Sequence, residues 1–375
     1  MDFEYSEDQR ALRDLARQIL DDRVTNERLK RLDSDPDAFD RETWLELAKV
    51  HLLGASLPES CGGSGLGFTE LCLLLQEVGR AVLPAPVLPT LVLGALPIAR
   101  FGSDAQQRAW LPGVATGDSV LTGALVEPLG ADPSRPRLVA QRGADGSGWR
   151  LSGEKTCVPV VHLAERVVVS ARTGARSAGL FLVDPGSAGL TSARQQTTNG
   201  EPQFQLSLEG VRGEALGDPE AGFAALEAWL DRVRAAYASV QLGCTERMLE
   251  QTAEYGRERR QFDRPIGSFQ AFHQRAADAY CSVEALRLAT WEAVFRLDDE
   301  RDARESVQVA SYFAGRPAAM VAFACSHLHG GIGSDTDYPL HRYFLWIKQN
   351  ELQLGSGSDA LRSLGRDLAE NAESV

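Results

Sequence analysis

Residues 255–270 read Tyr255-Gly-Arg-Glu-Arg-Arg-Gln-Phe-Asp-Arg-Pro-Ile-Gly-Ser-Phe-Gln270. Long segments with apolar residues at helical spacing flank this stretch on both sides, so it is predicted to connect two helices. The guanidinium of Arg259 can hold a pyrophosphate through two parallel charge-assisted hydrogen bonds, which lysine cannot reproduce. Phe262 can pack on such a ligand, while Gln261 and Gln270 can satisfy its polar edges. The stretch is therefore suited to a ligand that contains a pyrophosphate.

The same residues also have a simpler interpretation as a charged, solvated connection, because arginine recurs at Arg257, Arg259, Arg260 and Arg264. A second segment, His327-Leu-His-Gly-Gly-Ile-Gly333, favours the ligand-binding interpretation. Its glycines allow backbone N–H groups to approach a phosphate without an intervening side chain. The two histidines could instead suggest a metal site, but no third ligand follows at a suitable spacing, so no metal is predicted.

The remaining pattern indicates three parts in the order helices, strands, helices. Residues 1–118 show apolar residues at helical spacing after the capping-box-like start Ser6-Glu-Asp-Gln9. Residues 119–218 contain short β-prone segments separated by Gly, Pro, Asp and Asn, which predicts a compact antiparallel β-domain. Residues 219–375 return to long helices, and Pro317 is expected to kink or break one of them.

Composition excludes several classes of function. The formal net charge of -13 argues against non-specific nucleic-acid binding, which needs a basic surface. The six cysteines lack metal-ligand spacing and several lie in apolar helical sequence, so they are expected to be buried thiols. The acidic N-terminus is unlike a secretory signal, and no apolar run reaches the roughly 20 residues of a membrane span. A cytoplasmic location is therefore expected.

Taken together, these motifs resemble the acyl-CoA dehydrogenase family over essentially the whole chain. The loop Pro58-Glu59 with Gly62-Gly63 and the turn after Phe101 also resemble family segments. The resemblance implies an N-terminal helical domain, a middle β-barrel or sandwich, a C-terminal four-helix bundle, and FAD as cofactor. Cofactor-binding residues carried over from it are Arg259, Gln261, Phe262, Ile266, Phe269, Gln270, His327, Gly330 and Gly331. His327 stands where the family commonly has glutamine, and the family's glycine-rich turn approaches the dinucleotide of the neighbouring subunit.

The chain departs from the family at the catalytic base. Family members use a carboxylate to remove the substrate α-proton while a hydride leaves the β-carbon for the flavin. The usual glutamate precedes a Gly-Thr or Gly-Ser pair, and here Ser356 stands before Gly357-Ser358. The alternative position in some relatives corresponds to Val233. A displaced base remains possible at Asp231, Glu351 or Asp359, although charged residues at helix ends are commonly caps.

The family's contacts to the flavin ring are also altered. A Thr-Glu-Pro stretch appears as Val126-Glu-Pro128, without the hydroxyl. A Trp-Ile-Thr/Ser stretch is replaced by Cys157-Val-Pro159, and Pro159 has no backbone N–H. The family residues that would contact the flavin ring and remove the proton are therefore lost, whereas those that would bind the dinucleotide are kept.

With this asymmetry, the chain most resembles the non-catalytic subunits of the α2β2 acyl-CoA dehydrogenases of bacterial sterol side-chain degradation. The resemblance implies that the chain completes the FAD site of a catalytic partner, with a steroid side-chain CoA thioester as substrate. One alternative is a self-sufficient homo-oligomeric dehydrogenase with a displaced base. Others are a flavin-dependent monooxygenase or oxidase on the same scaffold, and an interaction protein without flavin.

Overall fold

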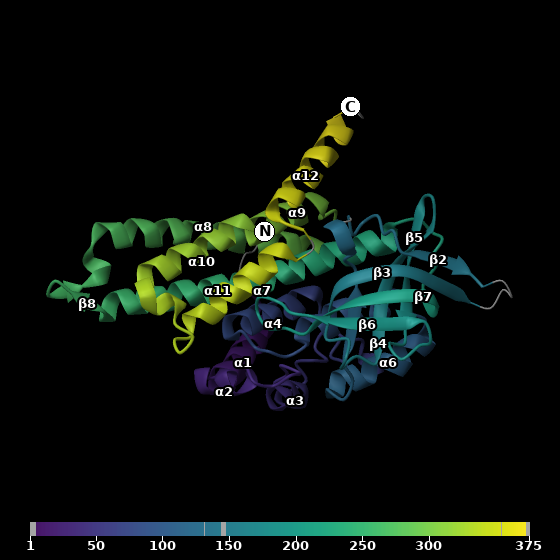
Figure 1. The fold of residues 1–375 in the computed structure, drawn as a ribbon, viewed down its shortest axis with the longest axis horizontal. Coiled ribbons are helices and arrows are strands. Elements are labelled where there is room, and N and C mark those ends of the chain that lie inside the picture. The colour runs from purple at the N-terminus through teal and green to yellow at the C-terminus, as the bar shows by residue number, and fades with distance from the viewer. Residues whose placement is uncertain (1–4, 131, 144–147, 354, 373–375) are drawn as a thin grey trace. The chain divides into compact units, whose positions relative to one another are not determined.

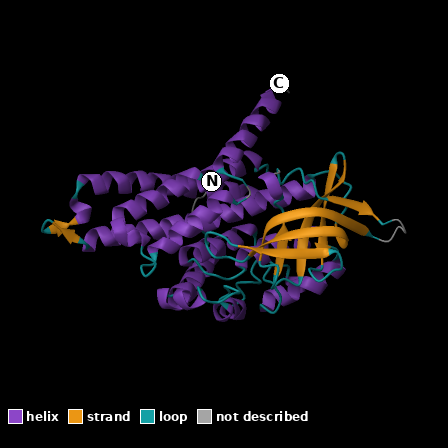
Figure 2. Ribbon diagram, viewed as in Figure 1, coloured by secondary structure: helices purple, strands orange, loops and turns teal. Residues whose placement is uncertain are grey.

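The computed structural model describes residues 5–130, 132–143, 148–353 and 355–372 (Figure 1). Helices come first along the chain, strands follow, and helices return, as the sequence predicts (Figure 2). Two compact units are distinguished by their internal contacts. The helical unit comprises residues up to 31, residues 72–83 and residues from 234 onward. The barrel unit comprises residues 32–71 and 84–233. The three domain boundaries expected from the sequence stay predictions.

The helical unit begins with a capped helix. The Ser6 hydroxyl accepts a hydrogen bond from the Gln9 amide at 3.1 Å, and the Gln9 side chain accepts one from the Ser6 amide at 3.0 Å. This confirms the predicted capping box. The helices that lie wholly or partly in this unit are α1 (Glu7–Arg23), α2 (Asn26–Leu32), α4 (Phe68–Ala81), α7 (Ala224–Glu258), α8 (Gln270–Asp298), α9 (Arg304–Ala314), α10 (Arg316–His329), α11 (Leu340–Leu352) and α12 (Gly357–Ala372).

Pro317 marks a break, as expected. It lies at the start of α10, where a missing N–H costs nothing, and α9 ends at Ala314 just before it. Gly315 lies between the two helices, and a Cβ atom on it would come within 2.8 Å of the Gly357 nitrogen. The junction of α9 and α10 therefore packs directly against the start of α12.

Two glycines let α4 and α7 approach each other closely inside the helical unit. A Cβ atom on Gly79 would lie 2.1 Å from the Val240 carbonyl oxygen, and one on Gly243 would lie 1.9 Å from the Gln76 carbonyl oxygen. The Cys244 thiol uses the same proximity to donate to the Gly79 carbonyl at 3.2 Å. Because these obstacles are backbone atoms, a side chain could be accommodated only by separating the helices.

Gly243→Ala is accordingly expected to destabilise the chain by about 2–3 kcal/mol, since overpacking forces backbone shifts. Urea unfolding followed by circular dichroism measures this change. Gly365→Ala is the matched control, because Gly365 lies on α12 and a Cβ atom there meets nothing within 4 Å. The control should be neutral or stabilise by up to about 1 kcal/mol. Equal midpoints for the two variants would show that the close helix crossing is not required.

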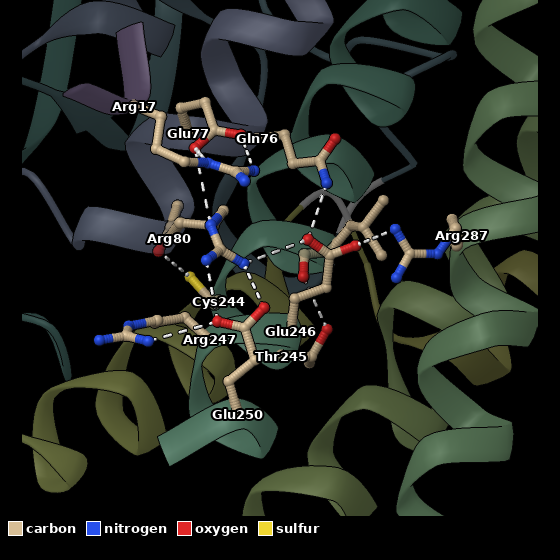
Figure 3. Close-up of polar contacts among 12 residues, drawn as sticks. Arg17, Gln76, Glu77, Arg80, Cys244, Thr245, Glu246, Arg247, Glu250 and Arg287 are labelled. Atoms are coloured by element: carbon tan, nitrogen blue, oxygen red, sulfur yellow. Dashed lines mark hydrogen bonds and ion pairs between the residues drawn. The ribbon is translucent and has the colours of Figure 1, made fainter. Parts of the chain in front are cut away.

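The α4–α7 crossing also encloses a charged cluster (Figure 3). Arg80 makes two hydrogen bonds to Glu250, at 2.9 and 2.8 Å, and lies 3.6 Å from Glu77 and 3.7 Å from Glu246. Arg17 holds Glu77 through a second bidentate pair, at 2.7 and 2.9 Å. Arg287 approaches Glu246 to 2.6 Å, and Gln76 donates to the same carboxylate at 2.8 Å. Arginine and glutamate side chains therefore alternate through this cluster, in which the carboxylates of Glu77 and Glu246 are almost fully buried.

The barrel unit is built on a sheet that closes on itself. Its strands are β1 (Leu121–Ala124), β2 (Val139–Arg142), β3 (Trp149–Pro159), β4 (Arg166–Gly174), β5 (Ser177–Val183), β6 (Leu190–Gln195) and β7 (Gln203–Leu216). Neighbouring strands follow the order β1-β4-β2-β3-β7-β5, and β5 pairs back with β4, while β6 adds to β7. The pairings β1–β4 and β2–β4 are parallel, which corrects the expectation of a wholly antiparallel domain.

The barrel unit also contains helices, all but the last of which precede its strands. They are α3 (Arg41–Lys49), η1 (Glu59–Cys61), the π-helix η2 (Pro89–Ala95), α5 (Leu96–Phe101), α6 (Asp104–Thr116) and the short η3 (Pro128–Gly130). The barrel core is aliphatic with a few aromatic side chains, including Trp149, Phe181 and Phe204. One buried charge pair lies beside it: Lys155 Nζ is 2.9 Å from Glu127 and 3.0 Å from the Ser170 hydroxyl.

Two further expectations can be compared with the structure. Cys61, Cys72, Cys244 and Cys325 are buried free thiols, as expected, whereas Cys157 and Cys281 are exposed. Within the described ranges, none of the helices combines the length and the apolar character that crossing a bilayer requires.

Candidate functional site

Residues 259–270 form a short hairpin and its continuation at one end of α7 and α8 (Figure 1). Strands β8 (Arg260–Gln261) and β9 (Arg264–Pro265) pair antiparallel. The tip residues Phe262 and Asp263 have φ angles of 52° and 61°, a left-handed conformation that costs energy for residues other than glycine. The Phe262 side chain is 87% exposed. Backbone strain and an exposed aromatic side chain therefore coincide at one tip, as is common at ligand-binding sites.

The chain holds this hairpin in place through its own contacts. The Ile266 amide donates to the Arg259 carbonyl at 2.8 Å, and Arg260 donates to the Asp263 carbonyl at 2.6 Å. The Arg264 guanidinium lies 4.0 Å from the centre of the Phe269 ring. The turn η4 (Ile266–Ser268) packs on the last turn of α7, since a Cβ atom on Gly267 would lie 2.7 Å from the Gly256 carbonyl oxygen. Two of the four arginines thus shape the hairpin itself.

The other polar side chains of the hairpin point away from the chain. Arg259, Gln261 and Gln270 are exposed, and none of these side chains has a hydrogen-bonding or ionic partner within the described residues. Ile266 and Phe269 are half-buried beneath them. The hairpin therefore presents a guanidinium, two amides and a phenyl ring to its surroundings.

The glycine-rich turn begins where α10 ends. Gly330 has φ 67° and ψ -144°, a combination open to glycine alone, and its amide donates to the carbonyls of Ser326 and His327. Gly331 has no such constraint, and a Cβ atom on it would meet nothing within 4 Å. His327 is exposed on the last turn of α10. A requirement for glycine at 331 would therefore come from something outside the chain.

The hairpin and the glycine turn lie at the same end of the helical unit. Two stacked rings connect these segments. The Tyr255 ring, in the last turns of α7, stacks on the ring of His329, which is the last residue of α10, and the ring centres are 4.4 Å apart. The structure thus brings together two segments that are roughly 70 residues apart in the sequence.

Ser356, which is predicted to stand at the position of the family's usual glutamate, lies near the opposite end of α10. Its amide and hydroxyl donate to the Asp359 carboxylate at 2.9 and 3.1 Å, which caps the start of α12.

The carboxylates considered as a displaced base are held within the chain. Asp359 also pairs with Arg362 at 3.0 Å, and Glu351 pairs with Lys348. Val233 is fully buried, and Asp231 is half-buried on α7. All three carboxylates considered as a displaced base therefore interact with other groups of the chain.

The two stretches that are predicted to stand in place of the family's flavin-ring contacts lie side by side in the barrel unit, since the Thr156 amide donates to the Val126 carbonyl at 2.9 Å. The Cys157 amide donates to the Gln195 side chain at 3.0 Å, and the Pro159 carbonyl accepts from Thr122 at 2.8 Å. These polar groups are satisfied within the chain. Cys157 has φ 52° and is exposed, so the second of these stretches contains a strained backbone position.

The carboxylate of Glu127, which lies between Val126 and Pro128, is also hydrogen-bonded within the chain. Its carboxylate accepts from the amides of Arg137 and Leu138 at 2.8 and 3.0 Å, and from Lys155. Burial alone would raise the pKa of Glu127, but the attraction of Lys155 and these hydrogen bonds outweigh it and lower that pKa. Glu127 is consequently a structural ion and is poorly suited to accept a substrate proton. Within the described residues, no group of three or more His, Cys, Asp or Glu side chains gathers as a metal site would require.

Comparison with known proteins gives the family. Models of the acyl-CoA dehydrogenase N-terminal and C-terminal domains match residues 6–118 and 220–368. Acyl-CoA dehydrogenase FadE27 of Mycobacterium tuberculosis is 38% identical over 379 residues, which cover 99% of each chain. The chain belongs to the acyl-CoA dehydrogenase family. The family's members are FAD-dependent oxidoreductases that act on acyl-CoA, so FAD is the cofactor.

Two solved structures share this acyl-CoA dehydrogenase fold closely. A variant of the Tcur3481–Tcur3483 steroid acyl-CoA dehydrogenase superposes with a TM-score of 0.93 at 44% identity, covering 98% of this chain and 99% of that one. The ChsE4–ChsE5 complex of Mycobacterium tuberculosis superposes with a TM-score of 0.91 at 38% identity and 99% coverage of both chains. Both neighbours are heteromeric complexes with a partner subunit.

Sequence reasoning missed one residue of this region. His329 lies within the quoted glycine segment, yet the candidates predicted from that segment are His327, Gly330 and Gly331. Stacking on Tyr255 gives His329 its place in the site. The available signal was the helical spacing of Tyr255 and Arg259, which implies that whatever contacts Tyr255 also lies near the start of the hairpin.

Proposed function

We propose that this chain is the non-catalytic, flavin-sharing subunit of a heteromeric acyl-CoA dehydrogenase. The observation that carries the proposal is an asymmetry within the chain. The exposed guanidinium and amides that suit a dinucleotide have no partners within the described residues, and a Cβ atom on Gly330 or Gly331 would meet nothing within 4 Å. The groups at the base position and beside the ring position are instead engaged in internal hydrogen bonds.

In this proposal, Arg259 holds the FAD pyrophosphate, with Gln261 and Gln270 on the polar edges of the adenosine part and Phe262 packed on it. His327 and the backbone N–H group of Gly331 complete the grip, and Gly330, whose own N–H is bonded to the end of α10, leaves room for the ligand to approach the backbone. Ile266 and Phe269 support it from beneath. FAD supplies the acceptor for the hydride that leaves the substrate β-carbon. This chain contributes binding and orientation, and the partner subunit contributes the carboxylate that takes the α-proton.

The positions of the two regions support this division of labour. The glycine turn follows the end of α10, and Ser356 packs near its start through the Gly315–Gly357 contact. A 14-residue helix is roughly 20 Å long, so the dinucleotide grip and the base position are well separated. A grip at one end of α10 can therefore serve a flavin whose ring belongs to the partner subunit.

The substrate class rests on similarity. We propose a steroid side-chain CoA thioester, because the Tcur3481–Tcur3483 neighbour is described as a steroid acyl-CoA dehydrogenase and matches 98% of this chain. An α2β2 assembly with a catalytic acyl-CoA dehydrogenase subunit is proposed on the same ground, since two heteromeric complexes are among the similar structures.

Gly331→Ala provides a selective test of the grip. A Cβ atom at this position meets nothing in the chain, so the melting temperature of the isolated protein should not change. In the assembled complex, the same methyl group would crowd the dinucleotide and should weaken FAD binding roughly tenfold. Equilibrium dialysis of FAD against the complex measures this change. Unchanged FAD affinity would remove Gly331 from the site.

The absence of a base in this subunit is tested by turnover. Wild-type chain alone and the Ser356→Glu variant alone should not dehydrogenate a steroid side-chain CoA thioester in a dye-reduction assay, whereas the co-purified complex should. Ser356→Glu restores a carboxylate but not the ring contacts, so one substitution should be insufficient. Dehydrogenation by either isolated chain would contradict the proposal and favour a self-sufficient enzyme.

A further inference from the structure

The His329 ring is held on three sides within the helical unit. It is only 4% exposed, and its Nδ1 lies 2.9 Å from the Cys325 carbonyl oxygen one turn earlier on α10. Its Nε2 lies 3.4 Å from the Tyr338 hydroxyl. The Tyr255 ring lies almost parallel to it, with 17° between the planes. These contacts come from α7, from α10 and from the segment before α11.

The partners of the ring determine its protonation. A carbonyl oxygen can only accept, so Nδ1 carries the proton and donates to Cys325. Nε2 is then free to accept from the Tyr338 hydroxyl. Burial lowers the pKa of His329, and the bond to the Cys325 carbonyl offsets this only partly, which favours the same neutral ring. One tautomer with a fixed orientation therefore satisfies both nitrogens.

His329 is joined directly to the glycine turn. Gly330 follows it in sequence, and a Cβ atom on Gly333 would lie 3.1 Å from the His329 Cβ, so the turn folds back over this residue. The far side of the turn is also anchored: Lys30 pairs with Asp337 at 2.7 Å, and Asn26 donates to the Asp337 carbonyl at 3.0 Å. With Tyr338 bound to His329, both ends of the turn are fixed.

The same ring is joined to the hairpin. Tyr255, which stacks on His329, accepts the backbone hydrogen bond of Arg259 through its carbonyl at 2.9 Å. A single imidazole thus lies between the last turn before Arg259 and the first residue of the glycine turn. A displacement of this ring would change the spacing between the Arg259 guanidinium and the backbone of the glycine turn at Gly330 and Gly331.

We propose that His329 is a positioning residue that fixes the distance between the two halves of the dinucleotide grip, so that the hairpin and the glycine turn bind one ligand together. This inference rests on the proposed function. It assigns His329 no contact with FAD. Its consequence is thermodynamic coupling: the contribution of Arg259 to FAD affinity depends on His329, although the two side chains serve different parts of the site.

The experiment is a double-mutant cycle on the assembled complex, with the FAD dissociation constant measured by dialysis. His329→Phe keeps an aromatic ring for Tyr255 but removes both hydrogen bonds, and should weaken FAD binding about fivefold to tenfold. In an Arg259→Ala background, the same substitution should change the constant less than about twofold. Tyr338→Phe removes only one hydroxyl, and should weaken binding about twofold to threefold without changing the fold.

Each outcome has one meaning. Equal fold-changes from His329→Phe in both backgrounds would show that the histidine acts independently of Arg259, and would overturn the positioning role. Unchanged FAD affinity in both the His329→Phe and the Tyr338→Phe complexes would also overturn the positioning role. If Arg259→Ala alone leaves FAD affinity unchanged, the proposed function itself fails. Thermal melting of each isolated chain identifies any variant whose effect is a loss of folding.

Discussion

Arg259→Ala is expected to weaken FAD binding to the assembled complex by about 2–4 kcal/mol, on the order of 30-fold to 1,000-fold in the dissociation constant. The Arg259 side chain has no partner within the described residues, so its removal costs the chain itself little. In the proposed complex, its loss leaves a pyrophosphate charge without its bidentate donor. Retention of FAD after gel filtration, read at 450 nm, measures the effect.

Arg257→Ala is the matched control for this variant. Arg257 is an exposed arginine in the last turn of α7, two residues before Arg259, and carries the same charge. It should leave FAD affinity within about twofold, because a nearby surface charge acts only through screened attraction. Equal losses in the two variants would indicate a general effect of positive charge and would contradict a specific grip at Arg259.

Arg80→Met is expected to cause the largest loss of stability, about 3–5 kcal/mol at pH 8. Arg80 is 13% exposed, and it lies among the carboxylates of Glu77, Glu246 and Glu250, of which the first two are almost fully buried (Figure 3). Methionine fills a similar volume but provides no charge. Arg362→Met is the control, because Arg362 is 75% exposed in its pair with Asp359 and should contribute about 0–1 kcal/mol.

The loss of folding stability in Arg80→Met should depend on pH. Burial raises the pKa of Glu246, and Arg80 is among the groups that oppose this rise. Burial acts on Glu250 too, but the hydrogen bonds and charge of Arg80 outweigh it and lower the Glu250 pKa. Without Arg80, both carboxylates favour protonation in the folded state, so the deficit falls as pH drops toward the ordinary glutamate pKa. Urea unfolding should give a deficit at least about 1 kcal/mol smaller at pH 5 than at pH 8. A deficit independent of pH would contradict the role assigned to this charged cluster.

The fold could be predicted where local patterns carry it. Helical spacing with capping signals gave the N-terminal helix, and Pro317 gave the break between α9 and α10. The change between helical spacing and short β-prone segments gave the order helices, strands, helices, and the family resemblance supplied the fold. The parallel pairings of β1 and β2 with β4 were missed, because strand direction depends on contacts between segments far apart in the chain.

The candidate site was predictable only in part, for a related reason. The residues of the hairpin and of the glycine turn could be read from the sequence, because each is a short contiguous motif. Their connection through Tyr255 and His329 depends on helix packing, which single motifs do not report. The close approach of α4 and α7 at Gly79 and Gly243 could not be predicted for the same reason, because the sequence around a glycine inside a helix does not indicate which segment packs against it. Likewise, the bond between Ser356 and Asp359 identifies a helix cap only once α12 is located.

The most direct test of the shared-site account is the flavin content of the purified protein. The chain should be colourless when expressed alone. After co-expression with a catalytic acyl-CoA dehydrogenase subunit, it should co-purify in a yellow complex with about one FAD per two chains, as an α2β2 assembly with shared sites requires. A yellow protein with about one FAD per chain, obtained without any partner, would contradict the account and indicate a self-sufficient flavoenzyme.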